Sequence, residues 1–113
     1  MRIKQKILVA VMGMGLALCG ASAASAATWQ DTHPRRVEVN HRLAHQDMRI
    51  NRDLRAGRIT PRHAAFLHHQ DHMIRMHERR DASFHGGHLT PTEQARLNHQ
   101  ENGVSRHIYR AAH

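Results

Sequence analysis

The chain has 113 residues, of which 17 are Lys or Arg, nine are Asp or Glu and 13 are His, and its formal net charge is +8 at pH 7. This length supports one small domain and excludes a large multidomain protein. The basic balance suits acidic partners rather than cationic ones, and the single cysteine excludes a disulfide framework.

Residues 1–26 have the three-part layout of a secretory signal peptide. Three basic residues in the first six positions precede an apolar run over 7–18 and a stretch of small residues. The run is shorter than the roughly 20 residues that cross a bilayer, so we expect cleavage, after Ala26 or alternatively after Ala23. A lipoprotein anchored through Cys19 is the minor alternative. The sequence therefore predicts a periplasmic or secreted protein.

After cleavage, fourteen arginines (17 basic residues minus three in the leader) face the nine acids, a net charge of +5 with neutral histidine. All 13 histidines lie in this part, so the charge climbs as the pH falls below about 6.5. We expect an acidic protein or a membrane surface as partner and no nucleic acid, because export separates the two. The small apolar content favours self-association into a homo-oligomer.

A flexible lead over 27–33 is predicted to precede the first helix, which starts at Pro34 and runs to about Ala56. Gly57 ends it, because glycine tolerates the left-handed cap conformation. The apolar face of this helix consists of Val39, Leu43, Ile50 and Leu54, with Gln46 between them.

The segment 57–61, Gly-Arg-Ile-Thr-Pro, recurs thirty residues later as Gly-His-Leu-Thr-Pro over 87–91. In each copy glycine stops one helix, threonine caps the next and proline takes its first position. The second copy adds Glu93, which completes a capping box.

These signals predict a second helix from Pro61 to about Phe84 and a third from Pro91 to about Arg110. Gly103 interrupts the third helix, and we expect close packing there.

A short string with the pattern Leu-x-His-Gln-acid-x-x-Ile/Val occurs three times, over 43–50, 67–74 and 97–104. The second and third copies belong to an internal repeat of period thirty, which indicates a repeated helix-plus-turn unit. Short turns favour antiparallel neighbours. The predicted fold of 34–113 is therefore all-α, with three antiparallel helices that form a bundle or extended helical hairpins.

The glutamine of each string, Gln46, Gln70 and Gln100, is predicted to join a hydrogen-bonded polar layer that fixes helix register. We expect the apolar stripe of the second helix to consist of Phe66, Leu67, Met73 and Ile74. The methionines Met48, Met73 and Met76 are expected in the core, with cuprous copper or varied apolar clients as alternatives.

Histidines recur at helical spacing and could hold a transition metal. His41 and His45 are four residues apart, as are His68 and His72, and His69 lies three residues before His72. Each pair supplies half of a tetrahedral zinc site, and imidazole also suits copper and nickel.

The predicted metal ligands are His41, His45, His68, His69 and His72. Asp47 and Asp71 are expected as carboxylate partners. No nucleophile signature or glycine-rich phosphate loop occurs, so we expect no enzyme activity.

The paired Gly-x-Ile/Leu-Thr-Pro turns resemble those of small, uncharacterised exported bacterial proteins rich in Gln, His and Arg. The segment Leu89-Thr90-Pro91-Thr92-Glu93-Gln94 is also similar to the motif of periplasmic Leu-Thr-x-x-Gln proteins, with Glu93 in place of the glutamine. That group includes Spy- and CpxP-like chaperones and ZraP-like zinc-binding proteins. The resemblance implies an envelope-stress protein that holds clients or senses metal.

Two functions follow from the sequence. The first is a histidine-based periplasmic binder of zinc, copper or nickel that acts as a buffer or stress sensor. The alternative is a basic, chaperone-like interaction module for acidic or unfolded clients that needs no metal.

Overall fold

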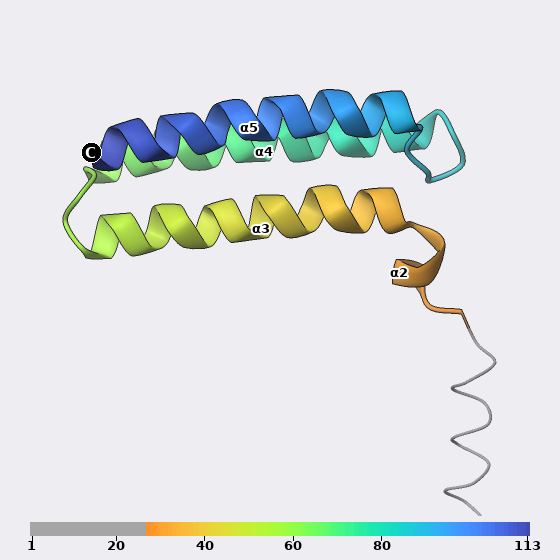
Figure 1. Ribbon diagram of the computed structural model, residues 1–113, viewed down its shortest axis with the longest axis horizontal. Helices are drawn as coiled ribbons and strands as arrows, with labels where there is room; N and C mark the ends of the chain where they lie inside the picture. Colours follow the sequence, from red (N-terminus) through yellow and green to blue (C-terminus); the bar gives the residue numbers. More distant parts are fainter. Residues whose placement is uncertain (1–26) are drawn as a thin grey trace, which may run out of the picture. The chain divides into compact units, whose positions relative to one another are not determined.

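The computed structural model describes residues 27–113, and the predicted signal peptide with Cys19 lies outside these residues (Figure 1). The described chain belongs to two units, which divide after Thr32. The first contains α2 (Trp29–Thr32), so part of the predicted flexible lead is helical. The backbone N–H of Asp31 donates to the Thr28 hydroxyl, and the Thr28 N–H donates to the Asp31 carboxylate. These reciprocal bonds cap the short helix.

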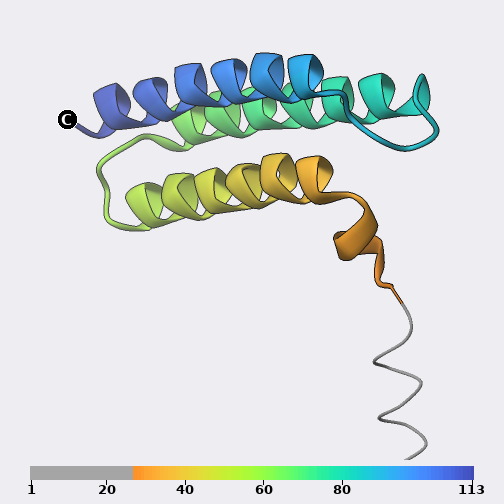
Figure 2. The same ribbon diagram turned by 45° about the vertical axis from the view of Figure 1, so that its right-hand side comes forward.

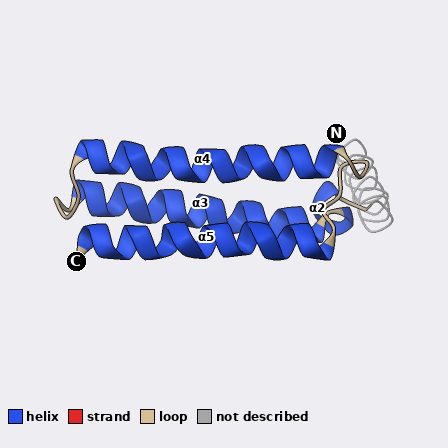
Figure 3. Ribbon diagram, turned by 90° about the horizontal axis from the view of Figure 1, so that it is seen from above, coloured by secondary structure: helices blue, strands red, loops and turns tan. Residues whose placement is uncertain are grey.

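The second unit, His33–His113, is an all-α bundle of α3 (Pro34–Arg55), α4 (Pro61–Ser83) and α5 (Pro91–Ala112) (Figure 2). The predicted helices are confirmed, and each boundary lies within two residues of its expected position. α4 runs antiparallel to α3 and α5, and each helix packs against both others (Figure 3). Within the described residues no helix is long and apolar enough to cross a membrane.

The repeated turn chemistry ends and starts the helices as predicted. Gly57 has φ of 74°, and the next N–H, from Arg58, bonds the Asp53 carbonyl at 2.9 Å across the end of α3. At the end of α4 the left-handed residue is Gly86, with φ of 63°, one residue before the predicted Gly87, and the next N–H, from Gly87, bonds the Ala82 carbonyl at 2.8 Å. These are Schellman-type closures, which satisfy carbonyls that a helix end leaves unpaired.

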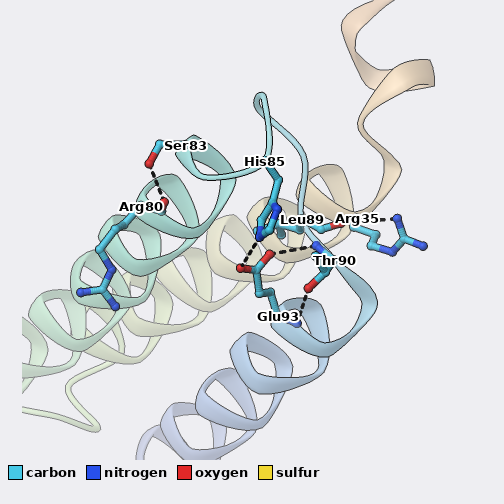
Figure 4. Close-up of polar contacts among 7 residues, drawn as sticks. All are labelled: Arg35, Arg80, Ser83, His85, Leu89, Thr90 and Glu93. Carbon is cyan, nitrogen blue, oxygen red and sulfur yellow. Dashed lines mark hydrogen bonds and ion pairs between the residues drawn. The ribbon is translucent and has the colours of Figure 1, made fainter.

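The start of α5 carries the complete capping box that the sequence predicts. The Glu93 N–H donates to the Thr90 hydroxyl at 3.1 Å, and the Glu93 carboxylate accepts the Thr90 N–H at 2.9 Å (Figure 4). The bond from the Thr90 backbone lowers the pKa of Glu93 below its usual value. At α4 only the first half is present, from the His63 N–H to the Thr60 hydroxyl.

The core of the bundle is built from small aliphatic side chains. The buried apolar residues are Val39, Leu43, Ile50, Ile59, Ala64, Leu67, Ile74, Ala82, Leu89, Leu97, Val104 and Ile108. The expected stripe on α4 is therefore half wrong, because Leu67 and Ile74 are buried whereas Phe66 and Met73 are exposed. Met48 and Met76 are exposed too, so the expected core packing of the methionines is wrong.

The close packing expected at Gly103 is also wrong. A Cβ added there would meet only the far end of the Arg106 side chain, at 3.8 Å. The position is ordinary helix with room for a methyl group, and glycine only adds conformational freedom to the unfolded chain.

Gly103→Ala should therefore raise the free energy of unfolding by about 0.5–1 kcal/mol, measured by urea denaturation. Gly57→Ala is the matched control, because no atom lies within 4 Å of the added Cβ but φ is +74°. It should lower the same quantity by about 1 kcal/mol. Destabilisation by Gly103→Ala would show that this part of α5 does need a glycine.

Candidate functional site

The glutamine of each repeated string forms a hydrogen bond with a residue of a neighbouring helix. Gln46 Nε2 donates to the Glu101 carbonyl at 2.8 Å and joins α3 to α5. Gln70 Oε1 lies 3.2 Å from His107 Nδ1, and Gln100 Oε1 lies 3.4 Å from His77 Nδ1. These last two pairs interchange under the thirty-residue repeat, so the α4–α5 contact is pseudosymmetric. Each glutamine bonds another helix, but the Gln70–His107 and Gln100–His77 pairs lie seven residues, about 10 Å, apart along the helices and so do not form the single predicted layer.

In two of the three strings the acid that follows the glutamine is buried. Asp71 is 2% exposed and Glu101 is 0% exposed, whereas Asp47 is half-buried. Among the described residues, no donor reaches the carboxylate oxygens of Asp71 or Glu101. The guanidinium of Arg42 lies 3.6 Å from Glu101 Oε1, beyond hydrogen-bonding distance. We call Asp71 and Glu101 the central acids.

Burial, a hydrogen bond with Asp47 and the charges of Asp47 and Glu101 together raise the pKa of Asp71 to about 8, against the opposing charge of Arg75. Burial likewise raises the pKa of Glu101 to about 8, with Arg42 opposing the rise and Glu38 adding to it. Both carboxyls are therefore mainly protonated at pH 7. A proton on Asp71 supplies the donor that its contact with Asp47 requires.

The predicted metal ligands separate into different places. His68 Nδ1 lies 2.8 Å from Asp47 Oδ1 and its Nε2 lies 2.9 Å from Asn51 Oδ1, so both ring nitrogens are engaged. The exposed His72 joins His68 around a hollow of about 150 Å³, whose other lining residues are Asp47, Asp71 and Arg75.

His41 and His45 instead line a groove of about 320 Å³ that reaches Ser105 of α5, and His69 is exposed on α4. Across residues 27–113, no three His, Cys, Asp or Glu side chains are grouped to hold a metal ion. The predicted contact of Asp47 with the histidines is present, and the metal itself stays a prediction.

Arginines and acids occupy different depths. Five of the nine acids in 27–113 are buried, and none of the fourteen arginines is. The buried acids take some arginines as partners at the bundle surface: Glu78 pairs with Arg36, and Asp53 pairs with Arg58 at 3.2 Å. The buried acids are Asp53, Asp71, Glu78, Asp81 and Glu101.

A cationic groove follows the C-terminal half of α3. It consists of three hollows of about 320, 360 and 460 Å³ that share Arg49. We call it the α3 arginine groove. Its charged lining residues are His41, Arg42, His45, Arg49, Arg52, Asp53, Arg55, Arg58 and His113. Its one acid, Asp53, is bound to Arg58, so the groove presents positive charge.

No protein-family model, curated protein or solved structure matches the chain. The resemblances to exported Gln/His/Arg-rich proteins and to Leu-Thr-x-x-Gln proteins stay predictions.

Sequence reasoning missed the burial of Asp71 and Glu101, and it expected Asp71 only as a partner of histidine. The signal that could have found them is their place in the repeated string. The acid stands four residues after the buried leucine and three before the buried Ile or Val, as with Leu67, Asp71 and Ile74. This spacing places the acid on the same helix face as the core.

The central acids should make stability pH-dependent. Their folded pKa of about 8 lies above the unfolded value near 4, so the folded state holds protons that the unfolded state loses. This stabilisation is complete below pH 4 and is lost as the pH rises to about 8, by up to about 1.4 kcal/mol per pH unit for each group.

Asp71→Asn combined with Glu101→Gln should remove this pH dependence, because amides do not titrate. The urea midpoint of the unmodified protein should fall between pH 6 and 8.5 more steeply than that of the double variant. Histidine titration acts on both proteins alike, so their difference isolates the carboxyls. Equal slopes would contradict the raised pKa values.

Proposed function

We propose that this chain is an exported, periplasmic or secreted helical module that binds acidic polypeptides through arginine. The observation that carries the proposal is the separation of charge: the bundle buries five acids and leaves every arginine of 27–113 at least partly accessible. Arginine suits this role because its guanidinium forms paired hydrogen bonds with a carboxylate.

Protonation of the central acids strengthens the positive charge. With Asp71 and Glu101 neutral, seven ionised acids oppose fourteen arginines in 27–113, and the net charge at pH 7 rises from 14 − 9 = +5 to 14 − 7 = +7 with neutral histidine. The field around the bundle therefore attracts anions more strongly than composition indicates.

The α3 arginine groove is the proposed contact surface. Arg52 and Arg55 both line it, and within residues 27–113 no hydrogen bond or ion pair with another side chain engages either of them. They are available to a carboxylate without the loss of an existing bond. A polypeptide can follow the groove along the helix, whereas a flat membrane touches only the outermost side chains.

The test is binding of a fluorescent Ser/Glu peptide of about 18 residues, followed by anisotropy. Affinity should fall as salt rises from about 50 to 200 mM, because the contacts are ionic and solvent-exposed. Arg52→Gln with Arg55→Gln should weaken binding about tenfold, equivalent to 1.4 kcal/mol.

The matched control is Arg96→Gln with Arg106→Gln, which removes the same charge from exposed positions of α5 outside the groove. It should weaken binding by less than about threefold. Equal losses in both variants would remove the groove from the proposal. Binding to anionic vesicles but not to the peptide would replace the acidic polypeptide with a membrane surface.

Transition-metal binding is the second candidate, with zinc, copper or nickel as the ion. Its support is the hollow lined by Asp47, His68, Asp71 and His72. Nitrogen and carboxylate ligands are a set that zinc accepts. Ligation would require His68 to release Asp47 or Asn51.

Calorimetric titration with zinc and cupric ions tests this candidate. We expect a dissociation constant below about 1 µM that is lost in His68→Ala with His72→Ala. The control, His41→Ala with His45→Ala, should retain it, because those side chains line the α3 arginine groove instead. Equal affinity in all three proteins would place any bound metal elsewhere.

A further inference from the structure

The large apolar side chains that the core excludes are concentrated on α4 and the residue that ends it. Phe66, Met73, Met76 and Phe84 are 55%, 42%, 45% and 72% exposed. Met73 and Phe84 stand seven and eighteen residues after Phe66, which are close to two and five whole helical turns. Phe84 keeps helical backbone angles as the C-cap. Phe66, Met73 and Phe84 therefore form a line about 27 Å long, and Met76 lies about 80° to one side of it around the helix. We call these four residues the α4 ridge.

A groove adjoins the α4 ridge at Phe66. It has a volume of about 430 Å³ and lies between the start of α4 and the end of α5, with Leu67 and Ala111 completing its apolar wall. Three basic side chains, His63, His107 and Arg110, form its charged lining. An apolar side chain that enters this groove would have the guanidinium of Arg110 and two imidazoles beside it.

No acid of α4 reaches the surface near the α4 ridge. Asp71, Glu78 and Asp81, which are the acids of α4, are all buried. The exposed ionisable residues of α4 are basic: Arg62, His63, His69, His72, Arg79 and Arg80. A second copy of the chain would set arginine against arginine on this surface, whereas a partner with carboxylates beside its apolar side chains would be complementary.

We propose that the α4 ridge and its groove dock an amphipathic helical segment of a partner protein, one whose apolar face is flanked by acidic residues. A helix of about 18 residues matches the length of the ridge. The methionines let the surface adapt to different apolar sequences, because their side chains are unbranched and polarisable. The inference rests on the proposed function and narrows its clients to acidic segments that also carry apolar side chains.

The experiment compares two peptides of about 18 residues with equal charge. One is a Leu/Glu peptide with leucine on one helix face, and the other is the Ser/Glu peptide in which serine replaces each leucine. The protein should bind the Leu/Glu peptide at least about tenfold more tightly. Phe66→Ser combined with Met73→Ser and Phe84→Ser should reduce its affinity to that of the Ser/Glu peptide.

The control replaces Trp29, which is 46% exposed and belongs neither to α4 nor to the lining of the α3 arginine groove, with serine. It should leave the tenfold preference intact. Circular dichroism should show unchanged helix content in both variants, because every replaced side chain is exposed. Loss of the preference in the control as well would overturn the assignment to α4.

The remaining outcomes separate the inference from the proposed function. Equal affinity for both peptides overturns the α4 docking site and leaves the arginine-based function standing. Failure to bind either peptide at low salt removes the proposed function itself. A dimer in sedimentation that dissociates in the ridge variant would make a second copy the occupant and overturn the inference.

Discussion

Two carboxyl groups, on Asp71 and Glu101, are buried in the bundle, and within residues 27–113 no cation is within hydrogen-bonding distance of either. An isolated charge in such a place costs several kcal/mol, so protonation is the less costly state. Gln70 and Gln100, which precede these acids in the repeated strings, bond neighbouring helices. The register of the bundle and the neutrality of its centre therefore depend on the same short sequence pattern.

The distribution of charge on the surface follows from that centre. A buried acid that is protonated, as Asp71 and Glu101 are at pH 7, no longer offsets the charge of an arginine outside. Glu78 and Asp53 form ion pairs with Arg36 and Arg58. Within residues 27–113, no acid forms an ion pair with Arg52 or Arg55. A chain with a moderate positive charge thus folds into a body whose accessible charge is strongly positive.

The apolar residues are divided in a similar way. Three closely packed helices enclose a narrow space that leucine, isoleucine and valine fill. Phe66 and Phe84 are left outside together with the methionines of α4. The exposed arginines can bind the carboxylates of an acidic amphipathic helix, and the exposed Phe and Met residues of α4 can bind its apolar face. One type of partner therefore accounts for both the charged and the apolar surface.

The sequence by itself determined the helices, because the glycine, threonine and proline of each turn act on their own backbone neighbours. It also determined that each glutamine faces a neighbouring helix, since helical spacing fixes which residues share a face. Only the tertiary structure decided how wide each buried face is. Phe66 and Leu67 differ by about 100° around α4, and the positions of α3 and α5 bury one and expose the other. The same packing turned His41 and His45 away from His68 and His72, because α3 meets α4 along one side and α5 along another.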